Sequence, residues 1–187
     1  MKLARLVAFC MLFSVAAAFP VKSQTTAQTA SGRSTSVAGT WAAGGAFGFS
    51  NPTGDDDLDA EPALDGYLEH FFTDRVSARG SLMLLEYDRA DVAGTNGVDI
   101  AAINGNVQYQ WDGHTVRPFI TGGVGVYDYD PDFGGDETEL GLNAGGGVNF
   151  PLTDRFAIQL VGAFHGTTAD GQPDSFFNGT VGARWLW

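Results

Sequence analysis

The stretch LGLNAGGGVNF, residues 140–150, alternates between two kinds of side chain. Its even positions are apolar or glycine, and its odd positions are only glycine or asparagine. A period of two is typical of an extended strand with one apolar face. Ordinary soluble strands have about five or six residues, whereas a tilted strand needs about 9–11 to cross a bilayer. This stretch of 11 residues therefore predicts a membrane-spanning β-strand.

Seven further segments repeat this alternation, so the sequence predicts eight strands. Four of them alternate clearly and three less cleanly. The clear segments are residues 101–111, 116–126, 156–165 and 177–187, and the others are residues 41–49, 67–72 and 76–87.

In two of the weaker segments, the pattern does not decide which side chains point to the polar side. Glu69 and His70 are adjacent, so either could point to the polar side. Arg79 and Glu86 have opposite parity within one segment. Either a bulge lies between them or Glu86 sits above the membrane.

The connections between the segments alternate in length, which is typical of periplasmic turns and extracellular loops. With an even number of strands, the N-terminus and the C-terminus are both expected on the periplasmic side. Short turns are expected near residues 73–75, 112–114 and 152–155, and longer loops near 51–64, 88–98, 128–138 and 167–175.

Alternation alone does not say which face meets water. A soluble sandwich or barrel would hide the apolar face, whereas a membrane barrel turns it to lipid and its polar face inward. Aromatic residues such as Trp41, Trp111 and Trp185 gather at strand ends, as in interfacial girdles, and the polar face is rich in Gly, Asn and Gln. We therefore expect an all-β, eight-stranded, antiparallel up-and-down transmembrane β-barrel.

The N-terminal segment has the pattern of a secretory signal. Lys2 and Arg5 precede an apolar run over residues 6–19, which is too short for an ordinary membrane-spanning helix. An uncleaved anchor is the alternative. The sole cysteine, Cys10, lies in this segment, so no disulfide is expected in the barrel. The expected organisation is a signal peptide at 1–24 with cleavage between 18 and 24, a flexible leader at 25–37 and the barrel at 38–187.

Three stretches carry a resemblance to a known family: RPFITGGVGVY at 117–127, residues 140–150, and GARWLW at 182–187. The chain resembles the outer-membrane β-barrel family that includes OmpA-type, OmpX-type and opacity-type domains. The resemblance implies a Gram-negative outer membrane, contact with its lipid and lipopolysaccharide, and the barrel-insertion machinery as a partner. Trp185 and Trp187 resemble the terminal insertion signal, although family members often end in Phe. No peptidoglycan-binding domain is expected after the barrel, so the resemblance does not imply that OmpA function.

Charged side chains on the polar face predict an interior plug. Four of them lie about three residues from the periplasmic ends of their strands, and three amides fall near the same level. Buried charges are tolerable when they pair, and an eight-stranded barrel is just wide enough for side chains to fill it. The alternative is a narrow gated pore that favours anions. The predicted members are Glu69, Arg79, Arg117, Arg184, Gln108 and Gln159, with Asn149 nearby.

The net charge of −12 disfavours nucleic acid as a partner. The acidic residues of the chain gather in the long connections. There they would repel anions and attract divalent cations that bridge lipopolysaccharide phosphates. The alternative is a solvated, self-repelling surface. The first loop is expected to hold Asp55, Asp56, Asp57, Asp59 and Glu61.

Asp128, Asp130, Asp132 and Glu139 have the ligand spacing of an EF-hand loop. Phe133 replaces the turn glycine, and predicted strands flank the loop, so a true EF-hand is not expected. Weak binding of Ca²⁺ or Mg²⁺ is the expected cofactor chemistry, and no other cofactor is predicted.

A catalytic alternative is a lipid A-modifying enzyme that uses His165 and Thr167 with Asp170 nearby. Parity places His165 inside the barrel, and a His-x-Ser motif is absent. His70 and His114 lack partners at zinc-ligand spacing. We therefore expect a monomeric, non-enzymatic protein for envelope integrity and surface interaction through acidic loops. A narrow solute channel is the second hypothesis.

Overall fold

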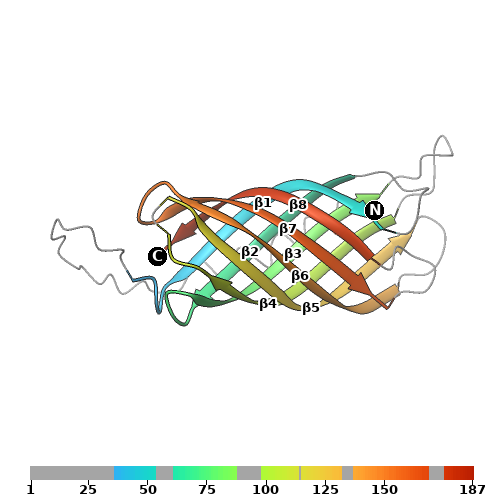
Figure 1. The fold of residues 1–187 in the computed structure, drawn as a ribbon. Coiled ribbons are helices and arrows are strands. Elements are labelled where there is room, and N and C mark those ends of the chain that lie inside the picture. Colours follow the sequence, from blue (N-terminus) through green and yellow to red (C-terminus); the bar gives the residue numbers. More distant parts are fainter. Residues whose placement is uncertain (1–35, 54–60, 88–97, 114, 132–136, 169–174) are drawn as a thin grey trace. The chain divides into compact units, whose positions relative to one another are not determined.

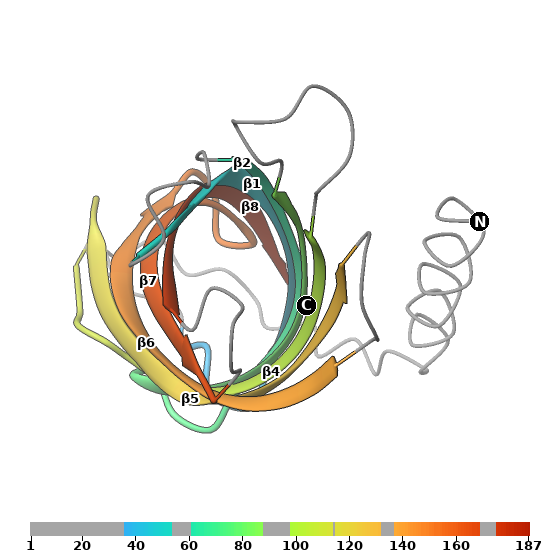
Figure 2. The same cartoon turned by 90° about the vertical axis from the view of Figure 1, so that its right-hand side faces the viewer.

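The computed structural model describes residues 36–53, 61–87, 98–113, 115–131, 137–168 and 175–187. Within them, every strand pairs antiparallel with the next, and the last pairs with the first, so the sheet closes into a barrel (Figures 1 and 2). No helix in the described part is long and apolar enough to cross a membrane. The strands are β1 (Trp41–Pro52), β2 (Glu61–Phe71), β3 (Val76–Tyr87), β4 (Val98–Gln110), β5 (Arg117–Pro131), β6 (Glu137–Pro151), β7 (Phe156–Thr167) and β8 (Ser175–Leu186).

The strands are staggered around the barrel. A path from Trp41 through successive ladder partners crosses β2 to β8 and returns to β1 at Asn51, ten residues further along. Stagger and tilt are linked in a closed barrel, and eight-stranded barrels tilt by about 35–45°. Figure 1 shows the strands crossing the barrel obliquely. Residues at one depth therefore sit at shifted ladder positions.

The predicted alternation of faces is confirmed. Asn143, Asn149 and Gln159 are buried on the inner wall, the face that lines the barrel interior. Leu140 and Leu142 are almost 70% exposed on the outer wall, the face turned away from the interior. Soluble proteins rarely expose so continuous an apolar surface, so the soluble sandwich or barrel is excluded.

The structure decides which side chains point inward in β2 and β3. Glu69 is buried on the inner wall, while the ring of His70 lies outside, 4.7 Å from the ring centre of Trp41. The β3–β4 ladder runs without interruption, so no bulge separates Arg79 from Glu86. Glu86 is instead exposed on the outer wall, one residue before β3 ends.

Several strands extend further toward the long loops than the sequence pattern suggested. Glu61, expected in the first loop, begins β2 and pairs with Ser50. Asp128 and Asp130, also expected in a loop, belong to β5. The ladder continues because polar side chains are well placed in strands once they lie outside the apolar band.

Glycines have different surroundings on the two walls. A Cβ at Gly48, on the inner wall, would lie 1.9 Å from the carbonyl oxygen of Gly179. A Cβ at Gly66, Gly80 or Gly105, on the outer wall, would meet nothing within 4 Å. Inner glycines thus permit close approach, whereas these outer ones leave open space. Each strand has an outward glycine near its middle: Gly45, Gly66, Gly80, Gly105, Gly122, Gly146, Gly162 and Gly179.

Candidate functional site: the barrel interior and the acidic rim

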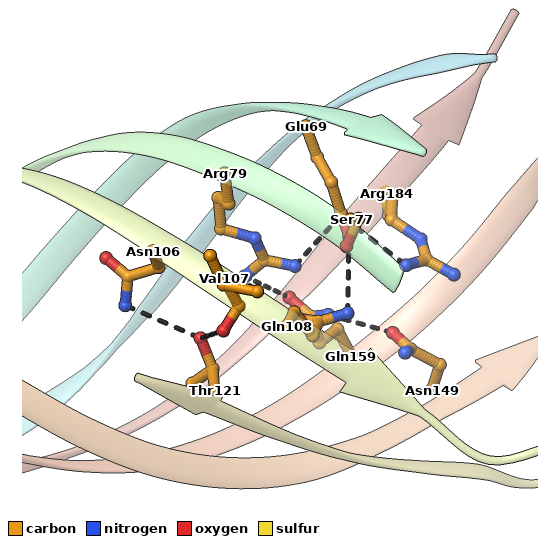
Figure 3. Close-up of polar contacts among 10 residues, drawn as sticks. All are labelled: Glu69, Ser77, Arg79, Asn106, Val107, Gln108, Thr121, Asn149, Gln159 and Arg184. Carbon is orange, nitrogen blue, oxygen red and sulfur yellow. Dashed lines mark hydrogen bonds and ion pairs between the residues drawn. The ribbon is translucent and has the colours of Figure 1, made fainter. Parts of the chain in front are cut away.

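A single carboxylate organises the inner wall near the short turns. Glu69 Oε1 accepts hydrogen bonds from Ser77 Oγ at 2.5 Å and Gln108 Nε2 at 3.2 Å. Glu69 Oε2 accepts one from Arg79 at 3.1 Å and lies 3.5 Å from an Arg184 nitrogen. Four contacts from three other strands therefore converge on one side chain (Figure 3).

Arg79 extends this cluster across the interior. Its second terminal nitrogen donates to Gln159 Oε1 at 3.1 Å, and Gln159 Nε2 donates to Asn149 Oδ1 at 2.8 Å. Its guanidinium also lies 3.9 Å from the ring centre of Tyr67, within the range of a cation–π contact. The chain of bonds thus crosses from β3 to β6.

We call these side chains the ionic layer. Glu69, Arg79 and Arg184 are 0%, 8% and 3% exposed. Buried charges of this kind require paired partners. Glu69 pairs with Arg79 on the adjacent strand β3 and with Arg184 on β8, and the Arg79–Gln159 hydrogen bond joins β3 to β7. Their side chains lie in the interior of the barrel. The ionic layer comprises Glu69, Ser77, Arg79, Gln108, Asn149, Gln159 and Arg184.

The structure brings together five of the six side chains predicted for the plug, and Arg117 does not join them. Its Nε donates to the carbonyl oxygen of Gly113 at 2.9 Å. Arg117 is the first residue of β5. It lies at the short-turn end of the strand, where its side chain meets the backbone of the β4–β5 turn.

A small polar cavity lies beside the ionic layer, with a volume of about 40 Å³. A buried water needs about 10–15 Å³ of such space, so the cavity has room for a few water molecules. Its lining is mainly polar: Asp65, Arg79, Ser81, Met83, Asn104, Asn106, Thr121, Asn143, Val161, Ala163, His165, Asn178 and Thr180.

An apolar cluster, the aromatic lid, fills the interior toward the long loops. Tyr127, Tyr129 and Phe176 are fully buried there. Sequence reasoning missed this lid because it searched the inner wall for polar residues. Parity could have found it, since Tyr127 and Tyr129 alternate with the outward-facing Val126 and Asp128. The lid comprises Ala63, Met83, Leu85, Ile100, Ala102, Tyr127, Tyr129 and Phe176.

His165 belongs to the underside of this lid. Its Nδ1 lies 2.8 Å from the hydroxyl of Tyr127, which donates to Asn104 Oδ1 at 2.9 Å. Its ring stacks on Phe176, with ring centres 4.7 Å apart. The hydroxyl of Thr167 lies 3.0 Å from that of Tyr129. His165 and Thr167 therefore each contact a tyrosine, and the third suggested member, Asp170, lies outside the described residues.

Acidic side chains also line up on the outer wall at the loop end of the strands. Glu86 is the ladder partner of Asp99, and Asp99 is the partner of Asp130. All three have outward parity. Cβ atoms of directly opposed residues lie about 4.5–5.5 Å apart, so three carboxylates form a row across β3, β4 and β5. We call this the acidic row.

The residues with EF-hand spacing occupy two faces of the sheet. Asp128 is exposed on the outer wall and accepts a hydrogen bond from Thr138 at 3.0 Å. Glu139 has inward parity on β6 and accepts one from Thr168 at 2.5 Å. Among the described residues, no group of three His, Cys, Asp or Glu could hold a metal ion. Asp132 and the four aspartates expected in the first loop lie outside the described range.

These features match a known family. The model of the family "Outer membrane protein beta-barrel domain" matches residues 7–184. The chain belongs to this outer-membrane β-barrel family. The barrel is therefore a protein of the Gram-negative outer membrane, and the exposed apolar band of its outer wall faces lipid.

Solved structures share the fold of this outer-membrane barrel at low sequence identity. OprG from Pseudomonas aeruginosa is 12% identical, with a TM-score of 0.58 over 80% of this chain and 96% of that one. The N-terminal β-barrel domain of OprF from the same organism is 16% identical, with 0.53 over 80% and 98%. The attachment invasion locus protein Ail of Yersinia pestis is 14% identical, with 0.53 over 80% and 99%. No curated protein sequence matches the chain.

Proposed function

We propose that this outer-membrane barrel is a closed, monomeric, non-enzymatic protein that supports the integrity of the envelope. The observation that carries the proposal is the filled interior. The ionic layer occupies one level of the lumen and the aromatic lid another. Between them, the cavity has room for only a few waters. A barrel with a filled interior acts through its outer surface rather than by conducting solutes.

Conductance of the purified, folded protein in a planar lipid bilayer tests this closure. We expect no conductance steps across the usual range of voltages. Stable open steps would overturn the closed barrel and support the second hypothesis, a narrow channel for small solutes. That hypothesis draws on the polar cavity, which would supply the middle of such a path.

We propose further that the acidic row contacts lipopolysaccharide through divalent cations. Three carboxylates at neighbouring ladder positions concentrate negative charge at one place on the outer wall, and such a surface attracts divalent cations. Glu86, Asp99 and Asp130 sit at the loop end of the outer wall, above the apolar side chains of Leu82 and Ile103. Phosphates of lipopolysaccharide lie at that boundary of the bilayer, where hard cations join oxygen ligands.

Binding of purified lipopolysaccharide with and without Mg²⁺ tests this contact. The triple variant Glu86→Gln, Asp99→Asn, Asp130→Asn keeps the shape of each side chain and removes its charge. It should weaken the Mg²⁺-dependent binding. The matched control, Asp112→Asn with Asp154→Asn, removes carboxylates from the short turns at the other end and should leave the binding unchanged. Equal binding by all three proteins would reject the proposed contact.

An enzymatic role is the third hypothesis, and it is tested by hydrolysis of labelled lipid A. The proposed non-enzymatic role predicts no turnover by the wild-type barrel. Turnover that His165→Ala abolished would revive the enzyme. The contacts of His165 favour a structural role, because its Nδ1 is taken up by Tyr127 and its ring by Phe176.

A further inference from the structure

Residues 36–40, just before β1, fold back over the short-turn end of the barrel. The amide of Thr40 donates to the carbonyl oxygen of Val37 at 3.1 Å, which closes a four-residue turn. The third residue of this turn, Gly39, has a φ of 78°, a value that favours glycine. The amide of Gly39 also donates to Phe71 at 2.7 Å, the last residue of β2. These hydrogen bonds hold the turn against the end of β2.

A carboxylate in the β2–β3 turn holds the start of this segment. Asp74 Oδ1 accepts three hydrogen bonds, from Ser36 Oγ at 2.7 Å, the amide of Val37 at 2.7 Å and the amide of Ala38 at 3.1 Å. Hydrogen bonds to an ionised acceptor are about twice as strong as neutral ones. This carboxylate therefore acts as a latch on a segment more than thirty residues away in sequence.

The latch itself is held from inside the barrel. The carbonyl oxygen of Asp74 accepts a hydrogen bond at 2.9 Å from Gln110 Nε2, which is buried on the inner wall. The hydroxyl of Thr73 accepts the amides of Arg75 and Val76 and shapes the same turn. The carboxyl group of Asp74 takes no part in the barrel ladder. Its contacts with the segment are additional to those that build the barrel.

The segment places one apolar side chain in the mouth of the barrel. Val37 is only 9% exposed and packs with Ala42, Phe71 and Leu186. These three are inner-wall residues at the short-turn ends of β1, β2 and β8. The guanidinium of Arg184, from the ionic layer, lies 5.3 Å from the ring centre of Phe71. Val37 therefore covers the apolar floor beneath the ionic layer.

We propose that residues 36–40 are a stopper that closes the short-turn mouth of the barrel, with Asp74 as its latch. The stopper excludes water and solutes from the charged pairs of the ionic layer on that side. Unlatching it exposes the mouth while the barrel stays closed in its walls, because no ladder bond between β1 and β8 is involved. This inference concerns the mouth alone and does not depend on the proposed contact with lipopolysaccharide.

Reactivity of a thiol placed under the stopper tests the proposal. The reporter is Ala42→Cys in the full chain carrying Cys10→Ser, because Ala42 is fully buried beneath Val37. A charged, membrane-impermeant thiol reagent is applied to the folded protein in detergent micelles. Loss of hydrogen bonds to a charged acceptor shifts a local opening by about ten-fold or more. Asp74→Ala should therefore raise the rate of labelling by about ten-fold or more.

A second variant and a matched control keep the test decisive. Val37→Gly removes the side chain that fills the mouth, leaves the latch in place, and should also raise the rate. Asp112→Ala removes a turn carboxylate that pairs with Arg75 and not with the stopper, and should leave the rate unchanged. A shift in gel mobility on heating confirms that each variant is folded. If the wild type, Asp74→Ala and Val37→Gly label at the same rate, the stopper is rejected.

Discussion

The two walls of this barrel are made by the same eight strands, yet their side chains have different kinds of neighbours. On the inner wall, Glu69 of β2 contacts side chains from β3, β4 and β8. On the outer wall, Ile103 and Val107 are more than half exposed. Curvature brings inner side chains together and spreads outer ones apart.

This difference predicts how substitutions behave. Residues that share a hydrogen-bond network have non-additive effects, whereas separated sites add. Inner-wall changes should therefore have large and coupled effects, and outer-wall changes small and independent ones. The following experiments measure the free energy of unfolding from lipid vesicles in urea unless stated otherwise.

The largest effect is expected for Glu69→Ala. The change leaves Arg79 and Arg184 buried without their shared carboxylate, and loss of one partner of a buried pair costs about 3–5 kcal/mol. Glu86→Ala, on the outer wall of the next strand, is the matched control and should change stability by about 0.5 kcal/mol or less. Equal effects would remove the distinction between the walls.

The next effect is expected for Gly48→Ala on the inner wall. The new methyl group would meet the carbonyl oxygen of Gly179, and forced overpacking costs about 1–3 kcal/mol. The unfolding midpoint should fall accordingly. A midpoint equal to that of the wild type would mean that β1 and β8 can move apart at this level.

A somewhat smaller loss is expected for Tyr127→Phe in the aromatic lid. The variant keeps the ring and removes the hydroxyl that joins Asn104 to His165. His165 Nδ1 then loses this partner, at a cost of about 1–2 kcal/mol, whereas Asn104 Oδ1 keeps the hydrogen bond from Asn143. Combining it with His165→Phe should cost less than the sum of the single changes. Strict additivity would show that the two side chains are not coupled.

The latch at the edge of the inner wall should respond to acid. The hydrogen bond from Ser36 lowers the pKa of Asp74 most, and burial opposes it. The amides of Val37 and Ala38 and the charge of Arg117 add to the lowering, so the pKa lies below its ordinary 3.8. The ionised carboxylate therefore holds the stopper fully above pH 3.8 and releases it as the pH falls through the lowered pKa.

Amide NMR shifts of Val37 and Ala38 measure this titration. Both should move together with a midpoint below 3.8. In Asp74→Asn, the same amides should show no such step. A midpoint at or above the ordinary value would contradict the described latch.

The smallest effect is expected for Gly80→Ala on the outer wall. The added methyl group meets open space, and glycine within a strand is less favourable than alanine by about 0.5–1 kcal/mol. The variant should therefore be slightly more stable than the wild type. A loss of stability here would show that the lipid-facing surface needs its glycine for a contact that packing within the chain does not reveal.

Much of the fold could be predicted from the sequence, because the period of two is a local property. Strands such as 140–150 and 156–165 carry it in every residue, so their two faces could be assigned before any pairing was known. The level of Glu69, Arg79 and Arg184 could also be inferred, since each lies close to a short turn. Their mutual contacts then follow from the width of an eight-stranded barrel.

The rest depends on pairing that the local pattern does not contain. The ten-residue stagger follows from all eight ladders together, and it sets which residues share a depth. The sequence pattern predicts the loop end of β5 too early, because acidic residues such as Asp128 have low strand propensity, whereas pairing across the sheet sustains the strand. The stopper could not be foreseen, since the partner of Ser36 and Val37 is Asp74, whose position across the mouth depends on the closed ring.

The seam between β1 and β8 has a consequence for how the protein reaches its place. The backbone of Trp41 exchanges two hydrogen bonds with that of Trp187, and the ladder continues from there to Pro52. Before β8 pairs with it, the free edge of β1 would expose a row of unpaired backbone amides and carbonyls. Each unpaired group costs several kcal/mol in hydrocarbon. The strands thus cannot cross one at a time, as apolar helices do. Entry into the bilayer and joining of the two distant chain segments are one concerted event.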